Sequence, residues 1–258
     1  MADAKGVALV TGASSGIGLE LARCFAKDGH ALIVTSEDGS ELEQAARELQ
    51  ADGSGEVAVV VADLADPAGP ERLYESVHRS HRTPDFLVNN AGRGVYGDFA
   101  RETDLEAELR MIQLNVVSVV HLTKRFAPEM VARGSGKILI TSSIAALAPT
   151  PKLDVYSATK AFEFAFAEAI ANELKDTGVT VTALLPAETE TGFFERAGMA
   201  DTPIGRSDKS DPADIARAGY DAMMKGTDHV IAPFSAKMRA ALTSVLPERM
   251  ITAMARPE

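Results

Sequence analysis

The sequence predicts an α/β fold, a Rossmann-type, doubly wound parallel sheet with helices on both faces. Short, nearly continuous apolar runs such as Val7–Val10 recur along the chain, as expected of strands buried on both faces. Longer stretches with helical spacing separate these runs, which is typical of βαβ units. The first run leads into a glycine-rich turn at Thr11–Gly18 and then into a helical pattern from Leu19. A strand, turn and helix in this order bind phosphate groups.

Length and composition limit the class of protein. A chain of 258 residues suits one α/β domain, which we expect to span residues 1–258. Apolar residues make up 46% and charged residues 24%, the balance of a soluble globular protein. The net charge of −11 argues against nucleic acid and anionic membranes as partners. No apolar run is long enough to span a bilayer, and Met1–Lys5 lacks a signal-peptide pattern, so the expected location is the cytoplasm.

The glycine-rich turn has the spacing G-x-x-x-G-x-G, with glycines at 12, 16 and 18. Free backbone N–H groups and the positive end of the helix dipole face such a turn, and glycines let phosphates approach closely. The turn lacks the Gly-Lys-Ser/Thr of a triphosphate-binding loop. A tight connection without a ligand is the alternative, but the strand–turn–helix context favours dinucleotide binding.

The remaining elements follow the same alternation of strands and helices. Further strands are expected at 31–35, 56–61, 86–88, 137–140, 179–185 and 229–232. Helices are expected at 41–51, 67–81, 105–132, from Tyr156 through Ile170, and at 212–224, followed by an apolar helical tail at about 235–255. The segment at about 187–210 has little regular period, and long loops at the carboxyl edge of a sheet are usually functional, so it is expected to form a substrate lid.

Polar residues lie where strands end, and one lies inside an apolar helix. Asp63 follows the third strand, where it could accept a hydrogen bond from an adenine amino group or cap the next helix. Asn90-Ala91-Gly92 follows the fourth strand and is either a polar turn or a wall for the adenosine ribose. Asn115 lies among apolar residues, so its amide is either structurally satisfied or part of a functional hydrogen-bond chain.

Tyr156 and Lys160 lie four residues apart on a predicted helix, so their side chains are neighbours on one face. A nearby cation favours the phenolate and lowers the pKa of tyrosine, which makes Tyr156 a candidate general acid/base. An ordinary pair on a helix surface is the alternative.

Other catalytic classes find little support. The five histidines show no H-E-x-x-H spacing, and no cysteine accompanies them in a metal-binding pattern, so no metal site is expected. Ser143 lies outside any G-x-S-x-G sequence, which gives no support for a hydrolase. The single cysteine, Cys24, is expected to pack on the buried side of a helix.

Taken together, Thr11-Gly12-x-x-x-Gly16-x-Gly18, Asn89-Asn90-Ala91-Gly92, Asn115, Ser143 and Tyr156-x-x-x-Lys160 resemble the motifs of the short-chain dehydrogenase/reductase family in order and spacing. The resemblance covers residues 5 to about 232. It implies a seven-stranded parallel sheet in the order 3-2-1-4-5-6-7 and a nicotinamide dinucleotide cofactor.

The same resemblance implies roles for individual residues. Tyr156 would be the catalytic acid/base and Ser143 would orient the substrate oxygen. Lys160 would bond the nicotinamide ribose and lower the pKa of Tyr156, and Asn115 would support a proton-relay water. The cofactor would be bound by Gly12, Ser14, Ser15, Gly16, Ile17, Gly18, Ser36, Glu37, Asp63, Leu64, Asn90, Ala91, Gly92, Tyr156, Lys160, Pro186 and Thr191.

The end of the second strand bears on the choice of dinucleotide. In the family, an acidic residue there accepts the ribose hydroxyl of NAD, whereas a basic one pairs with the 2′-phosphate of NADP. The sequence has Ser36 and Glu37 there, and Ser15 where some relatives that prefer NADP have a basic residue. We therefore expect NAD(H) to be favoured over NADP(H), unless Glu37 is only a solvated charge at a helix entry.

One departure from the family pattern is Pro186-Ala187 in place of Pro-Gly, followed by Glu188 and Glu190. Because a positive φ would be costly for alanine, an ordinary φ is expected at Ala187. The two carboxylates have no assigned role.

The sequence thus predicts an NAD(P)-dependent oxidoreductase that interconverts a secondary alcohol and a ketone. Tyr96, Phe193, Phe194 and Met199 suggest an apolar substrate surface, although core packing would explain them equally well. A non-catalytic dinucleotide sensor or scaffold is the alternative, and a sugar-nucleotide epimerase or dehydratase would need a larger C-terminal domain. Helices apolar on several faces, together with the family resemblance, predict a homodimer or homotetramer.

Overall fold

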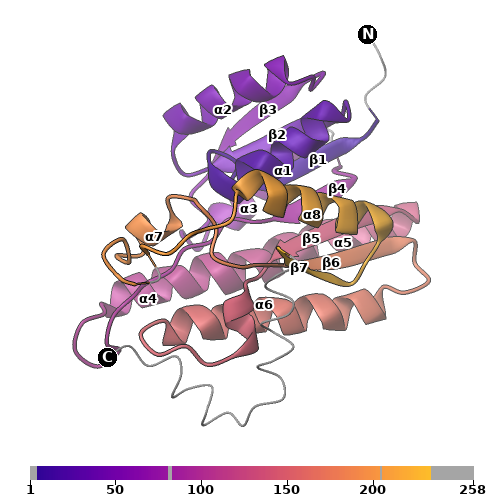
Figure 1. Cartoon of the computed structure of the whole chain (residues 1–258). Helices are drawn as coiled ribbons and strands as arrows, with labels where there is room; N and C mark the ends of the chain where they lie inside the picture. The colour runs from indigo at the N-terminus through magenta and orange to yellow at the C-terminus, as the bar shows by residue number, and fades with distance from the viewer. Residues whose placement is uncertain (1–4, 81–82, 204, 234–258) are drawn as a thin grey trace.

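The computed structural model describes residues 5–80, 83–203 and 205–233 (Figure 1). The helical tail expected at about 235–255 lies outside these residues. Within them, no helix is both long and apolar enough to cross a membrane.

Seven parallel strands form one sheet in the order β3-β2-β1-β4-β5-β6-β7, which confirms the expected fold. The strands are β1 (Val7–Thr11), β2 (Ala31–Ser36), β3 (Val57–Val61), β4 (Phe86–Asn89), β5 (Gly136–Thr141), β6 (Val179–Pro186) and β7 (His229–Ala232). The order reverses between β1 and β4. In doubly wound sheets, ligands bind at the carboxyl edge beside this reversal.

Helices cover both faces of the sheet. One face carries α1 (Gly16–Lys27), α2 (Gly39–Ala51) and α8 (Pro212–Lys225), and α1 and α8 lie side by side in Figure 1. The other face carries α3 (Gly69–Arg79), α5 (Ser118–Arg133) and α6 (Asp154–Glu173). Successive residues of β1 serve both cores, because Ala8 and Val10 pack on the first face and Leu9 packs on the second. Cys24 is buried in the first core, as expected.

The helix expected at 105–132 is interrupted. It consists of α4 (Leu105–Ile112), a π-helical turn η1 (Gln113–Val117) and α5. Single π turns are frequent at functional sites, and this one contains Asn115. Pro128 lies inside α5 without ending it.

Two segments expected to be irregular contain short helices. A 3-10 turn, η2 (Ile144–Leu147), follows Ser143, and α7 (Phe193–Arg196) lies within the segment expected to form a lid. A β-bridge between Thr189 and Ser210 joins the two ends of that segment.

Candidate active site

A cavity of about 490 Å³ opens at the carboxyl edge of the sheet, where the strand order reverses. Its volume lies in the range of small-molecule and cofactor sites. The glycine-rich turn lines one part, and Ser143, Tyr156 and Lys160 line another. The other predicted binding residues that line it are Ser36, Glu37, Asp63, Leu64, Asn90, Ala91, Gly92, Pro186 and Thr191. The cavity therefore brings together nearly all the predicted site residues, and Asn115 lies beside it.

The glycine-rich turn requires its glycines. Gly12 and Gly16 have φ angles of 64° and 57°, in the left-handed region that disfavours other residues. A Cβ atom on Gly18 would lie 2.1 Å from the carbonyl oxygen of Gly12, so a side chain there would clash with the backbone. A Cβ atom on Gly16 would lie 3.0 Å from the Cγ2 atom of Thr191, which places Thr191 over the turn.

The loop after β4 is attached to this turn. The Oγ1 atom of Thr11 accepts hydrogen bonds from the backbone N–H groups of Asn90 (2.9 Å) and Ala91 (3.0 Å). The side-chain amide of Asn90 donates to the carbonyl oxygen of Thr11 (3.1 Å). Ser15 occupies the N-cap position of α1, but among the described residues its side chain accepts no hydrogen bond from the first N–H groups of the helix. The first N–H groups of this helix are therefore available to an anion in the cavity, which is the fit a dinucleotide pyrophosphate needs.

Acidic side chains mark the end of the cavity beside β2 and β3. Glu37 pairs with Arg93 (3.3 Å), and both are partly exposed. Asp38, not Glu37, caps α2, because its carboxylate accepts from the N–H groups of Ser40 (2.8 Å) and Glu41 (3.0 Å). Glu37 lines the cavity and is also exposed beside the start of α2, so its role toward the ribose stays a prediction, with a solvated charge as the alternative. Arg93 lies 56 residues away along the chain, and no local motif predicted its contact with Glu37.

Asp63 is held at the same end of the cavity. One oxygen accepts from the N–H group of Ala65 (2.8 Å), and the other pairs with Arg110 (3.0 Å). Because α3 begins at Gly69 with Ala68 in the capping position, Asp63 does not cap that helix. Its carboxylate instead lines the cavity.

Tyr156 lies in the first turn of α6 and is 8% exposed. Its ring centre lies 5.8 Å from the ammonium of Lys160 and 5.2 Å from the ring centre of Phe193. Burial raises the pKa of Tyr156, whereas Lys160 and the Ser143 hydroxyl act to lower it. The cation acts in the expected direction, but burial has the larger effect, so the expected net lowering is wrong for the chain without a cofactor.

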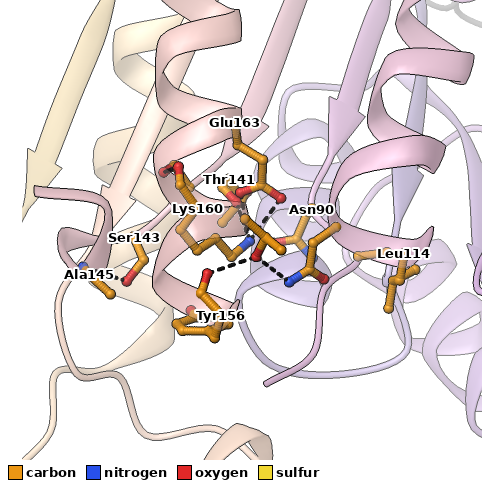
Figure 2. Close-up of polar contacts among 12 residues, drawn as sticks. Asn90, Leu114, Thr141, Ser143, Ala145, Tyr156, Lys160 and Glu163 are labelled. Atoms are coloured by element: carbon orange, nitrogen blue, oxygen red, sulfur yellow. Dashed lines mark hydrogen bonds and ion pairs between the residues drawn. The ribbon is translucent and has the colours of Figure 1, made fainter. Parts of the chain in front are cut away.

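Ser143 lies between the end of β5 and the start of η2. Its Oγ atom accepts a hydrogen bond from the N–H group of Ala145 (3.1 Å), which fixes the side chain at the cavity wall (Figure 2). Because a serine hydroxyl can accept and donate at once, Ser143 can still donate its proton, and its hydrogen bond with Tyr156 shows that it reaches the cavity beside that hydroxyl. Ser143 can therefore donate to an oxygen in the cavity.

Lys160 has an acidic partner that the sequence interpretation missed. Its Nζ atom donates to the carbonyl oxygen of Thr141 (2.9 Å) and lies 2.8 and 3.1 Å from the two carboxylate oxygens of Glu163 (Figure 2). The side chains of Lys160 and Glu163 are only 5% and 1% exposed. Burial lowers the pKa of Lys160, but Glu163 and Tyr156 together outweigh burial, so the pKa lies above its ordinary value. Burial also raises the pKa of Glu163 to about 7.

Asn115 is fully buried, and its amide contacts protein groups on both sides. Its oxygen accepts from the N–H group of Arg93 (3.1 Å), and its nitrogen donates to the carbonyl oxygen of Arg93 (2.9 Å) and to Thr159 (3.0 Å). A Cβ atom on Gly92 would lie 3.3 Å from Nζ of Lys160 and 3.4 Å from Oδ1 of Asn115. Asn115 is thus structurally satisfied by protein groups, and its part in a functional hydrogen-bond chain stays a prediction.

The segment after β6 covers the cavity beside Tyr156. Among the described non-glycine residues, positive φ angles occur at Lys152 and Asp176 and not at Ala187, which confirms the expected ordinary φ there. Glu190, which had no assigned role, lies 3.5 Å from the ammonium of Lys209. An apolar cluster joins this segment to α4 and α6. It contains Met111, Leu153, Tyr156, Phe194, Ala197 and Met199.

No group of three histidine, cysteine or acidic side chains lies close enough to hold a metal ion in residues 5–80, 83–203 and 205–233. The donors at the site are hydroxyl, ammonium, amide and backbone N–H groups. Such groups suit a phosphate-bearing organic cofactor and a substrate oxygen.

The sheet, the glycine-rich cradle and the tyrosine–lysine pair together define a nicotinamide-dependent oxidoreductase. The profile of the short chain dehydrogenase family matches residues 6–201, and the chain belongs to this family of NAD(P)-dependent dehydrogenases and reductases. An uncharacterized oxidoreductase of Staphylococcus saprophyticus is 32% identical over 219 residues, which cover 85% of this chain and 91% of the relative.

Two solved structures are similar over nearly the whole chain. A short-chain dehydrogenase from Sphingobium yanoikuyae in complex with NADPH is 30% identical, with a TM-score of 0.82 over 94% of this chain and 96% of the other. A bulky-bulky ketone specific alcohol dehydrogenase from Comamonas testosteroni is 26% identical, with a TM-score of 0.78 over 94% and 95% of the two chains.

Proposed function

We propose that this enzyme transfers a hydride between a nicotinamide dinucleotide and a secondary alcohol or ketone, with Tyr156 as the general acid/base. The observation that carries the proposal is one cavity with a phosphate cradle in one part and Ser143, Tyr156 and Lys160 in another. The bound dinucleotide supplies or accepts the hydride. When a carbonyl is reduced, negative charge develops on its oxygen, so a proton donor and a hydroxyl donor must both reach that atom. Tyr156 supplies the proton and Ser143 the second hydrogen bond.

The proposal assigns the following binding roles, which the position of each residue in or beside the cavity supports. Gly12, Ser14, Ser15, Gly16, Ile17 and Gly18 hold the pyrophosphate, and Thr191, packed over Gly16, closes this site near the carboxamide. The adenosine lies against Ser36, Glu37, Asp63, Leu64, Asn90, Ala91 and Gly92. Lys160 bonds the nicotinamide ribose beside Pro186, and Asn115 supports a relay water.

NAD(H) is the favoured dinucleotide in this proposal. Glu37, Asp38 and Glu41 all line the adenosine end of the cavity, and such carboxylates repel a 2′-phosphate. Arg93 offsets part of this charge through its pair with Glu37, so the preference over NADP(H) is modest. The Sphingobium relative was solved with NADPH, which is why the preference needs direct measurement.

The substrate is an apolar ketone or secondary alcohol. Ala145, Leu153, Phe193, Phe194 and Met199 line the cavity beside Tyr156. The Comamonas relative acts on bulky ketones, which supports the same class of substrate here. Residues 187–210 act as the lid over this part of the cavity.

The enzyme acts as a homodimer or homotetramer of a single-domain chain. Large apolar side chains on α4, η1 and α6 remain exposed, namely Leu105 (72%), Leu109 (50%), Val117 (42%) and Phe162 (40%). Burying this surface against a second copy would remove it from water. Light scattering at micromolar concentration would contradict this proposal if it found a monomer.

The decisive test is a panel of ketones and secondary alcohols, assayed with NADH, NADPH and their oxidised forms, for the natural chain and Tyr156→Phe. Phenylalanine keeps the ring and removes the proton, so turnover should fall by about 10²–10⁴-fold while dinucleotide affinity changes little. Undiminished turnover by Tyr156→Phe would refute the mechanism. Dinucleotide binding without turnover of any substrate by the natural chain would favour a sensor or scaffold.

A further inference from the structure

A buried carboxylate contacts the candidate catalytic lysine from the side away from the tyrosine. Glu163 lies one helical turn after Lys160 on α6, and Figure 2 shows Lys160 between Glu163 and Tyr156. The Glu163 side chain is 1% exposed, so water cannot take the place of its partner. A buried charge without a partner is strongly unfavourable, which makes the ammonium and the carboxylate mutually dependent.

The hydrogen bonds of Lys160 show what this contact does. An ammonium group has three N–H donors. One donates to the carbonyl oxygen of Thr141 on β5 and one to Glu163, which leaves one for the cavity that Lys160 lines. Glu163 and β5 therefore fix the direction in which the remaining donor points.

The charges around the pair are few. Lys160 is acted on by Glu163 and Tyr156, both on α6, and Glu163 is acted on by Lys160. The neighbouring elements contribute uncharged groups. The carbonyl of Thr141 on β5 accepts from Lys160, and a Cβ atom on Gly92, after β4, would lie 3.3 Å from its Nζ atom. Burial alone would favour the neutral amine, and Glu163 and an ionised Tyr156 both oppose it. When Tyr156 is protonated it carries no charge, so the carboxylate of Glu163 is then the charged group that favours the ammonium form of Lys160.

We propose that Glu163 is a positioning residue for carbonyl reduction, because it holds the Lys160 ammonium charged and directed at the cavity across the alkaline range. The inference rests on the proposed function. Reduction needs a charged Lys160 and a protonated Tyr156 together. Removing Glu163 destabilises the charge on Lys160 and also removes a charge that opposes ionisation of Tyr156. Both effects make reduction fail at a lower pH.

The first experiment measures Lys160 directly and needs no substrate. Lysine ¹³Cε NMR of the full chain, assigned with Lys160→Met, should show the Lys160 ammonium titrating at least about one pH unit lower in Glu163→Gln than in the natural chain. Glutamine keeps the size of the side chain and an oxygen that accepts from Lys160. Glu163→Ser is a second neutral variant and should shift the titration in the same direction.

Two controls separate charge from packing. Glu163→Asp keeps the charge and should stay close to the natural chain. Glu168→Gln removes a carboxylate from the same helix at an exposed position, where it pairs with His229 (2.8 Å), and should leave the Lys160 titration unchanged. An unchanged titration in both neutral Glu163 variants would overturn the proposal.

The second experiment follows kcat/KM for ketone reduction against pH. In Glu163→Gln, the pH above which kcat/KM declines should be lower by about one unit than in the natural chain. The loss of kcat/KM relative to the natural chain should therefore be about tenfold larger at pH 9 than at pH 6.5. A loss that is the same at every pH would show a merely structural role and overturn the proposal. If the natural chain reduces no ketone but the NMR shift is present, the role of Glu163 in keeping Lys160 charged stands and the proposed function fails.

Discussion

The two ends of the cavity use the same pairing of acidic and basic side chains in very different surroundings. At the adenosine end, Glu37 and Arg93 are 55% and 32% exposed, and water screens their attraction. At the catalytic end, Lys160 and Glu163 are 5% and 1% exposed. Exposed pairs can change with little cost, whereas breaking a buried pair leaves a charge that water cannot reach. The chain can therefore adjust its cofactor preference more freely than its catalytic centre.

The sharpest test of this difference is Lys160→Met, which leaves Glu163 buried without a partner. Removing one member of a buried pair costs about 3–5 kcal/mol of folding stability, and we expect this loss at pH 8.5. In the natural chain burial raises the pKa of Glu163 from 4.5 to about 7, although Lys160 acts to lower it. Removing Lys160 therefore raises this pKa further, so protonation of Glu163 favours the folded state more strongly in the variant. The deficit should therefore shrink as the pH falls to 5.5. Urea unfolding at the two pH values measures it.

The double variant Lys160→Met/Glu163→Leu is the matched control. It removes both charges and fills the space with apolar atoms, so most of the lost stability should return at pH 8.5. A deficit in Lys160→Met that does not depend on pH would show that Glu163 is not the origin of the cost.

A smaller effect is expected from Glu37→Arg at the exposed end. Replacing the acidic side chain removes repulsion of a 2′-phosphate and adds attraction, at about 1 kcal/mol or slightly more per charge in largely solvated surroundings. The two effects sum to about 2 kcal/mol, so affinity for NADPH relative to NADH should rise by about thirtyfold, measured by fluorescence titration at fixed ionic strength. Glu43→Arg, an exposed position on α2 that does not line the cavity, makes the same charge change and should leave the ratio unaltered. Tighter binding of NADPH than NADH by the natural chain would contradict the role given to Glu37.

The smallest effect is expected from Arg110→Ala. Arg110 pairs with Asp63 (3.0 Å), but both side chains are more than a third exposed, and Asp63 keeps its bond from the N–H group of Ala65. Exposed pairs contribute little to folding, so the midpoint of thermal unfolding should stay within experimental error. A clear fall in the midpoint would show that this exposed pair also stabilises the fold, and it would contradict the difference described between exposed and buried pairs.

Local patterns predicted the fold class and the pairing of Tyr156 with Lys160 because each depends on neighbours in the sequence. The strand order and the candidate roles of Ser143 and Asn115 came from the family resemblance instead. Apolar runs marked the strands, and the four-residue spacing of Tyr156 and Lys160 placed both on one face of α6. Glu163 escaped notice because a single acidic residue on a helix is usually solvated. Its burial depends on β5 and β6 packing against α6, and sequence spacing does not report such packing.

Other features depend on contacts across long stretches of chain. Arg93 meets Glu37 only because β4 and β2 end at the same edge of the sheet. The net effect on the pKa of Tyr156 depends on how far burial outweighs Lys160, and residue spacing does not report burial. The π turn at Asn115 could not be recognised from the spacing of apolar residues. It adds one residue to the helix, and this changes the spacing by less than one helical turn.

The π turn also restricts how this chain can change by insertion or deletion. An α-helix turns by about 100° per residue, so removing one residue between α4 and α5 would rotate the whole of α5 relative to α4. Either the apolar face of α5 would leave the sheet, or the amide of Asn115 would turn away from Arg93 and Thr159. The number of residues between α4 and α5 is therefore constrained twice, by the packing of α5 on the sheet and by the hydrogen bonds of Asn115.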